Sequence, residues 1–222
     1  MAATKTVQDS PTASVHAPDR LTTRLALGGV IGPVLYVVSF TIAGLLRAGY
    51  SPIHQAVSDL GVGPNAWLLD AAGVLNWLLL TAWVIAFLRC TDTALTARLR
   101  WLCAVLVALP PLGYGVASIF TEAPATLMVH WIVGANLGLL VPPAAFAVTG
   151  IALRRQNPWR GWGNYSLAAS VATVVIVAGT FWVFQPGTPV APARLGGLME
   201  RIAITEIPRA TTAGAAAATG LL

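Results

Sequence analysis

The sequence predicts an all-α integral membrane protein, a helical bundle of five transmembrane helices plus a weak sixth. Of its 222 residues, 56% are hydrophobic and only 9% are charged, whereas a soluble domain carries about 25% charged residues. The hydrophobic residues form long runs close to the ~20 residues that a helix needs to cross about 30 Å of hydrocarbon. Lysine and arginine gather on alternate connections, as expected for a chain that crosses a membrane repeatedly.

Residues 1–20 are polar and rich in Ala, Thr and Ser, so we expect a disordered cytoplasmic tail there. The first hydrophobic run is too long, and begins too far along the chain, to be a cleaved signal peptide. Proline pairs in the third and fourth runs predict kinks in those helices. The five runs cover residues 25–46, 66–88, 101–120, 127–153 and 165–184.

A sixth helix from about Leu198 to Leu222 fits a membrane poorly. Each ionised group near the centre of a bilayer costs about 2.5–3.5 kcal/mol on insertion scales. We therefore expect a membrane bundle over residues 22–205 and a weak final helix or tail over 206–222. The ionisable residues of this last segment are Glu200, Arg201, Glu206 and Arg209.

The placement of basic residues predicts the orientation. They cluster before the first run and after the second and fourth, whereas Arg47 follows the first run and Arg194 follows the fifth. The positive-inside rule then predicts a multi-pass protein of the cell membrane with a cytoplasmic N-terminus. Because the arginines form no basic stripe, we expect membrane lipids as partners and no nucleic acid.

The stretch YSPIHQAVSDLG, residues 50–61, stands out as a polar segment on the outer side. Ser51 followed by proline is typical of a helix start, and Gly61 suits a helix end. This pattern predicts a short helix over residues 52–60. Asn65 then follows as a candidate cap for the second membrane helix.

The other ionisable side chains expected on the outer side point to a candidate site. Asp70 and His130 each lie about one turn into a membrane helix, at a matching depth of about 5–6 Å. Ionisable residues inside a membrane usually face the bundle interior. The catalytic candidates are Asp59, Asp70, Glu122 and His130, and the ligand-binding candidates are His54, Ser58, Glu200 and Arg201.

Each candidate also has a structural explanation. Ser58 and Asp59 suit loop capping, His130 suits a hydrogen bond to a helix backbone, and Glu200 with Arg201 suits an internal pair in the last helix. The sequence contains no HExxH or CxxC motif. It therefore leaves any metal or cofactor unknown.

These features resemble the membrane-protein family called domain of unknown function 998. The resemblance spans roughly residues 22–205. It implies a six-span membrane protein and no established activity. The chain departs from the family pattern at its last helix, which is normally strongly apolar but here reads TEIPRATTAGAAAATG. The resemblance is carried by Gly32-Pro33, YSPIHQAVSDLG, Gly73, SIFTEAP, His130 and GLMERI.

Three classes of function fit the sequence, and enzymatic activity stays open. The leading hypothesis is a non-catalytic, outer-facing polar pocket that binds a lipid or isoprenoid-like molecule, a hydrophobic small-molecule ligand. The second is an intramembrane enzyme acting on a lipid, either a metal-dependent hydrolase or an acid-driven cyclase in which a buried carboxyl donates a proton. The third is a small transporter, although no inverted repeat is visible.

Overall fold

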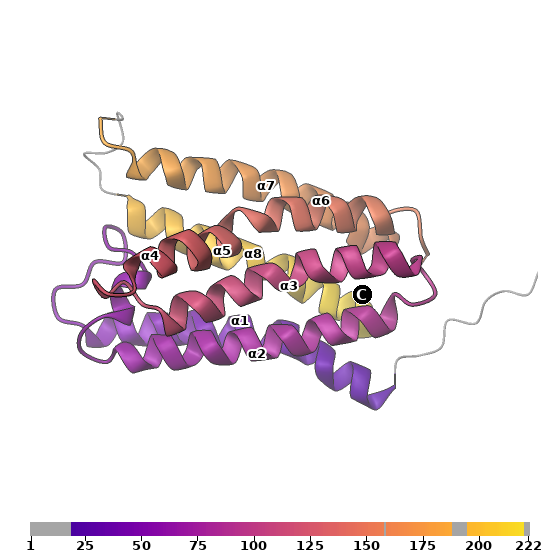
Figure 1. Cartoon of the computed structure of the whole chain (residues 1–222), viewed down its shortest axis with the longest axis horizontal. Coiled ribbons are helices and arrows are strands. Elements are labelled where there is room, and N and C mark those ends of the chain that lie inside the picture. Colours follow the sequence, from indigo (N-terminus) through magenta and orange to yellow (C-terminus); the bar gives the residue numbers. More distant parts are fainter. Residues whose placement is uncertain (1–18, 158, 188–194, 220–222) are drawn as a thin grey trace, which may run out of the picture.

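Helices make up most of the chain (Figure 1). The structure is a computed structural model that describes residues 19–157, 159–187 and 195–219, and no strand occurs among them. The all-α prediction is confirmed. The elements are α1 (Arg20–Leu46), η1 (Ser58–Gly61), α2 (Ala66–Cys90), α3 (Ala97–Ile119), α4 (Leu127–Val129), η2 (His130–Ala135), α5 (Asn136–Leu139), α6 (Val141–Leu153), α7 (Arg160–Phe184) and α8 (Gly196–Thr219).

Five spans in the described chain are long and apolar enough to cross a membrane, which confirms the five predicted runs. In chain order, the first three spans are α1, α2 and α3. The fourth span, Leu127–Leu153, combines α4, η2, α5 and α6, and the fifth is α7 up to Val183. The chain is therefore a multi-pass membrane protein. Most of the expected N-terminal tail, residues 1–18, lies outside the described residues, and Asp19 and Arg20 already begin α1.

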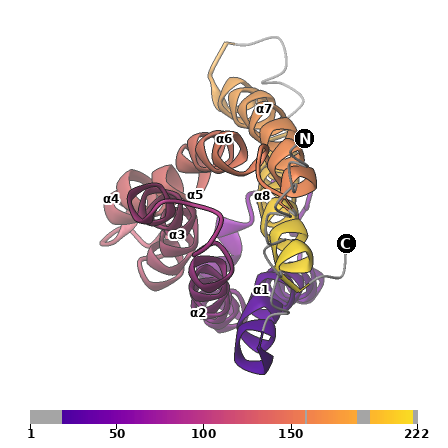
Figure 2. The same ribbon diagram turned by 90° about the vertical axis from the view of Figure 1, so that its right-hand side faces the viewer.

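The long helices form a closed ring. Seen along the bundle, α1, α2, α3, α6, α7 and α8 follow one another around it (Figure 2), and each packs on the next, with α8 closing the ring between α7 and α1. Helix α8 is continuous from Gly196 to Thr219, a length of about 36 Å at 1.5 Å per residue. The boundary expected at residue 206 falls inside this helix.

Small residues allow the helices of the ring to approach closely. A Cβ atom on Gly28 of α1 would overlap the backbone carbonyl of Leu79 on α2. A Cβ atom on Gly113 of α3 would lie 2.5 Å from the backbone nitrogen of Gly138 on α5. Close backbone approach through small residues is how membrane helices gain packing contact without a hydrophobic driving force.

The fourth membrane span is irregular, as its proline pair predicts. It contains a π-helical turn over His130–Ala135 and a break at Leu140, and Pro142 lies in the first turn of α6. Proline has no N–H group to continue a helix, so it is favoured at a helix start. By contrast, α3 runs without interruption through its own proline pair. Single π-turns are frequent at functional sites, and this one begins at His130.

The helix predicted over residues 52–60 is wrong. The stretch forms a turn at 52–54 and the single 3₁₀ turn η1. Distant donors occupy the carbonyl oxygens that a helix would need: Arg201 donates to Pro52 at 2.6 Å and to Gln55 at 3.0 Å. The hydroxyl of Tyr50 donates to Ala56 at 2.6 Å. Tertiary hydrogen bonds have overridden the local capping pattern. Asn65 does precede α2 as predicted, but without a side-chain capping bond.

Candidate functional site

A cavity of about 280 Å³ lies inside the ring at the end where the α1–α2 and α3–α4 connections meet. Every long helix of the ring except α6 contributes to its wall, and η1, η2 and α5 complete it. The residues that line the cavity are Tyr36, Ser58, Gly61, Leu69, Asp70, Gly113, Tyr114, Ala117, Ser118, Thr121, His130, Trp131, Gly134, Ala135, Asn136, Gly138, Leu139, Thr180, Phe181, Glu200 and Ile204.

The cavity joins the polar end of the bundle to its lipid-facing surface. Two of its large apolar residues are half exposed: Trp131 on η2 at 45% and Phe181 on α7 at 46%. These side chains belong to two of the spans that are long and apolar enough to cross a membrane. The cavity wall therefore includes residues that are exposed on the surface of the fourth span and of α7.

Two carboxylates line the cavity from opposite parts of the sequence. The Asp70 carboxylate lies against η1, where a Cβ atom on Gly61 would come within 3.1 Å of its Oδ1. The Glu200 carboxylate accepts a 2.7 Å hydrogen bond from the backbone N–H of Val57. Tyr36 lines the same cavity as both carboxylates. Asp70 and Glu200, both candidates from the sequence, thus line one cavity.

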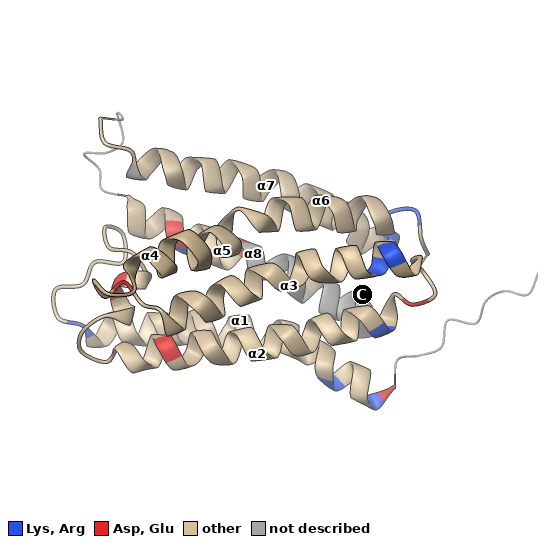
Figure 3. Ribbon diagram, viewed as in Figure 1, with Lys and Arg blue, Asp and Glu red and all other residues tan. Residues whose placement is uncertain are grey.

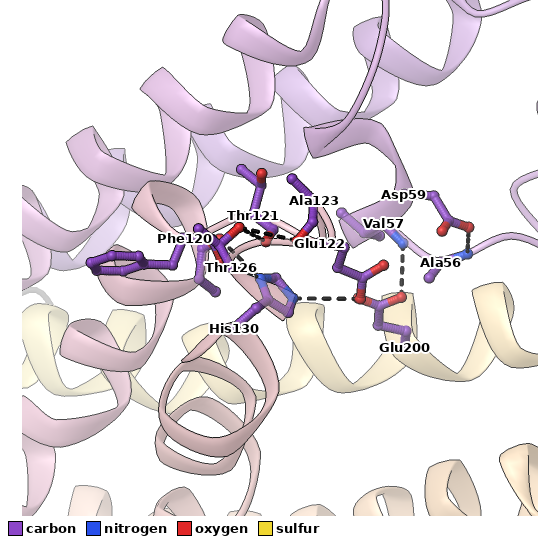
Figure 4. A network of polar contacts seen from close by, with 11 residues as sticks. Ala56, Val57, Asp59, Phe120, Thr121, Glu122, Ala123, Thr126, His130 and Glu200 are labelled. Atoms are coloured by element: carbon purple, nitrogen blue, oxygen red, sulfur yellow. Dashed lines mark hydrogen bonds and ion pairs between the residues drawn. The ribbon is translucent and has the colours of Figure 1, made fainter. Parts of the chain in front are cut away.

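His130 is held by backbone groups at the end of α3. Its Nδ1 lies 3.0 Å from the carbonyl oxygens of both Ala117 and Phe120 (Figure 4). Carbonyl oxygens only accept hydrogen bonds, so Nδ1 carries the proton. The other ring nitrogen, Nε2, faces Glu122 at 3.6 Å. Among the described residues, no hydrogen bond joins His130 to Ser58.

Glu122 and Glu200 bring two carboxyl groups close together. They lie beside each other in Figure 4 and interact electrostatically. The turn after α3 presents Glu122, and the Thr126 hydroxyl donates to the Thr121 carbonyl at 2.6 Å within that turn. Two neighbouring carboxyls and a histidine form a group that can share protons. Glu122 lies behind His130 and is not among the residues that line the cavity.

Besides Glu122, three other predicted site residues lie outside the cavity. The Asp59 carboxylate accepts a 2.9 Å hydrogen bond from the N–H of Ala56, so it caps its own loop. His54 is exposed in the turn at 52–54. Arg201 donates to loop carbonyls and to the Tyr50 hydroxyl, rather than pairing with Glu200 as expected. These positions support structural roles for Asp59 and Arg201.

The Tyr50 hydroxyl links the loop to α8 by accepting one hydrogen bond and donating another. Burial raises the pKa of the Tyr50 hydroxyl, and the hydrogen bond from Arg201 partly offsets this rise. The hydroxyl therefore stays protonated at neutral pH. It accepts from Arg201 and donates to Ala56, while the Arg201 guanidinium lies over the Tyr50 ring at 5.4 Å from its centroid.

Tyrosines within the spans are the site residues that the sequence analysis missed. Tyr36 and Tyr114 are each 8% exposed and both line the cavity. The Tyr114 hydroxyl is buried and has no hydrogen-bond partner among the described residues. A tyrosine far from the ends of an apolar run was an available signal, because interfacial tyrosines lie near the ends and a buried hydroxyl needs a partner.

Metal binding has no obvious ligand set within the described part of the chain. No group of three or more His, Cys, Asp and Glu side chains gathers there closely enough to hold one metal ion. Cys90 and Cys103 form no disulfide, and Cys103 is buried in the hydrophobic core.

The fold and the cavity define a class: a multi-pass helical membrane protein with an internal polar-ended cavity. The family model described as "Protein of unknown function (DUF998)" matches residues 30–207. The chain belongs to this family, which confirms the resemblance seen in the sequence. No curated protein and no solved structure matches the chain.

Proposed function

We propose that this protein binds a lipid or isoprenoid-like molecule in the cavity, with the head group at the polar end and the chain leaving toward the membrane. The observation that carries the proposal is the cavity's composition. Ser58, Asp70, His130 and Glu200 lie at one end, and half-exposed Trp131 lies in the apolar wall. Ligand sites are typically apolar cavities of about 300–1,000 Å³ with a few convergent polar groups. A volume of about 280 Å³ suits a head group and the first part of a chain.

A cavity-filling variant tests this proposal directly. Gly138 is buried and lines the cavity, yet a Cβ atom there meets nothing within 4 Å. Gly138→Leu should therefore fill the cavity without a steric clash at its Cβ. Gly161→Leu is the matched control, because Gly161 also has open space around its Cβ but does not line the cavity.

The measurement is native mass spectrometry of protein released from mild detergent. We expect the wild-type protein and Gly161→Leu to retain a lipid-sized adduct, and Gly138→Leu to lose it. A wild-type protein without any adduct, or an adduct retained equally in all three, would contradict the proposal. The same spectra would report any metal that the protein carries.

An acid-catalysed intramembrane enzyme is the second candidate. The observation that favours it is the group formed by His130, Glu122 and Glu200, with Asp70 on another wall of the same cavity. A carboxyl group that keeps its proton can start a reaction such as an isoprenoid cyclisation. Chromatography of the retained molecule from wild type and Asp70→Asn tests this candidate, because an enzyme would leave different molecules in the two proteins.

The proposed orientation puts the N-terminus in the cytoplasm and the cavity on the outer side of the cell membrane. Arginines are concentrated at the end that carries the α2–α3 and α6–α7 connections (Figure 3). The opposite end, with the cavity, is rich in carboxylates. The positive-inside rule favours this orientation.

A further inference from the structure

We infer that the head group taken by the cavity is a protonated amine, so the ligand is a long-chain hydrophobic amine rather than an alcohol or a phosphate. This inference rests on the proposed function and deepens it by naming the ligand class. Its basis is the set of charges, rings and unpartnered polar atoms around the cavity.

The ionisable side chains that line the cavity are two carboxyl groups and one histidine, His130. Asp70 and Glu200 both face it, and no lysine or arginine is among the lining residues. No described residue donates a hydrogen bond to the Asp70 carboxylate in this structure. A cationic group with N–H donors would satisfy that carboxylate, because charge-assisted hydrogen bonds are the strong ones.

The arginines near the cavity are committed to backbone carbonyls. Arg47 donates to Asp59 at 2.6 Å and to Pro64 at 2.8 Å. Arg201 donates to Pro52 and Gln55, as described above. A phosphate head group would therefore meet two carboxylates and no available guanidinium, which is electrostatically unfavourable.

Aromatic rings surround the same space. Four of the lining residues are aromatic: Tyr36, Tyr114, Trp131 and Phe181. The rings of Tyr36 and Tyr114 meet edge to face, with centroids 5.8 Å apart. Ring faces attract organic cations, and aromatic residues with carboxylates are the usual surroundings of a bound ammonium group.

The buried hydroxyl of Tyr114 supplies an independent indication of a ligand. Tyr114 is only 8% exposed, and its hydroxyl is buried without a hydrogen-bond partner among the described residues. Buried polar atoms without a partner are rare in native proteins. This hydroxyl marks a place for a polar head group, and an ammonium group bound at Glu200 could donate to the hydroxyl oxygen.

Three photoprobes that differ only in the head group test the inference. Each carries the same twelve-carbon chain with a diazirine and an alkyne, and ends in an amine, a hydroxyl or a phosphate. Protein in nanodiscs of zwitterionic lipid is labelled over a range of probe concentrations, and labelled peptides from the cavity wall are quantified. The variants are Asp70→Asn and the control Asp92→Asn, which removes an equal charge at an exposed position after α2.

We expect the amine probe to reach half-labelling at about tenfold lower concentration than the hydroxyl probe. That preference should disappear in Asp70→Asn and persist in Asp92→Asn. Equal labelling by amine and hydroxyl, stronger labelling by phosphate, or an amine preference unchanged in Asp70→Asn would overturn the inference while the cavity remained a lipid site. Labelling of cavity-wall peptides by none of the three probes would instead refute the proposed function.

Discussion

The backbone N–H of Val57 donates a 2.7 Å hydrogen bond to the carboxylate of Glu200, a residue 143 positions later in the chain. The next residue of α8, Arg201, donates to the carbonyls of the same loop. These bonds hold residues 50–57 against α8, directly before Ser58 on the cavity wall. The loop between the first two membrane helices is thus a fixed part of the site, even though it is mostly non-helical.

Arg201→Ala should loosen this loop. The guanidinium makes hydrogen bonds to Pro52, Gln55, Gly197 and the Tyr50 hydroxyl, so its removal should lower the free energy of unfolding by about 2 kcal/mol. Hydrogen exchange should rise over residues 50–57, and the melting temperature in detergent should fall. The melting temperature of Arg201→Lys should lie between those of the wild-type protein and Arg201→Ala. A lysine ammonium keeps the charge but cannot reproduce the planar, forked arrangement of N–H donors of a guanidinium group.

Arg155→Ala is the control for that experiment, since Arg155 is exposed in the connection between α6 and α7, at the end of the fold opposite the cavity. It should leave the melting temperature almost unchanged. A similar loss of stability in both variants, or no change in loop exchange in Arg201→Ala, would contradict the role of Arg201 described above.

His130 should show a difference between two substitutions. His130→Ala removes the donor that serves the Ala117 and Phe120 carbonyls, whereas the amide nitrogen of Asn can replace Nδ1. We expect His130→Asn to be about 1 kcal/mol more stable than His130→Ala in thermal unfolding. Equal stability would show that these hydrogen bonds contribute little. Asp70→Asn is the cleaner test of ligand binding, because His130 also has this structural role.

Cysteine labelling of intact cells tests the proposed orientation. Val62 is 39% exposed and follows η1 at the cavity end, and Thr93 is exposed between α2 and α3 at the other end. In a chain lacking Cys90 and Cys103, we expect a membrane-impermeant maleimide to label Val62→Cys but not Thr93→Cys. Labelling after permeabilisation controls for reactivity. The reverse pattern would put the cavity on the cytoplasmic side.

The start of α1 should lose stability only in acid. Asp19 caps this helix through a 2.7 Å bond from the Thr22 N–H, and its carboxylate pairs with Arg89 at 2.8 Å. The hydrogen bonds from Thr22, helped by Arg89, lower the pKa of Asp19. A lowered folded-state pKa gives stability that is present above the unfolded-state pKa of about 3.9 and is lost as the pH falls through the folded-state value.

The difference in melting temperature between wild type and Asp19→Ala should therefore be present at pH 7 and should shrink below about pH 4. Thermal unfolding in detergent at both pH values measures it. A difference that stayed constant down to pH 2 would mean that the Asp19 charge contributes nothing to the cap.

Element positions could be predicted well because hydrocarbon imposes one requirement on every span, a long apolar helix. The conformation of the loop after α1 could not be predicted. Ser51 and Gly61 satisfy the local rules for a helix, but Arg201 and Tyr50 donate hydrogen bonds to carbonyl oxygens that the helix would have used. No local pattern reveals a donor 149 residues away.

The candidate site was partly predictable for a similar reason. Asp70, His130, Ser58 and Glu200 were placed at one end from topology alone, and they line one cavity. Topology alone does not predict whether a neighbouring side chain points into the cavity or away from it. The Asp59 carboxylate, for example, points to the N–H of Ala56 instead. A single residue of rotation, about 100° on a helix, separates a cavity-facing side chain from one that faces a loop.

The first loop is attached to α8 mostly through main-chain atoms of the loop. Pro52 and Gln55 present carbonyls to Arg201, and Ile53 presents its carbonyl to the N–H of Leu198. Every amino acid supplies the same carbonyl, so a change of the exposed Ile53 side chain leaves these bonds in place. The exposed face of this loop can therefore acquire new recognition properties by mutation while the cavity beneath it keeps its shape.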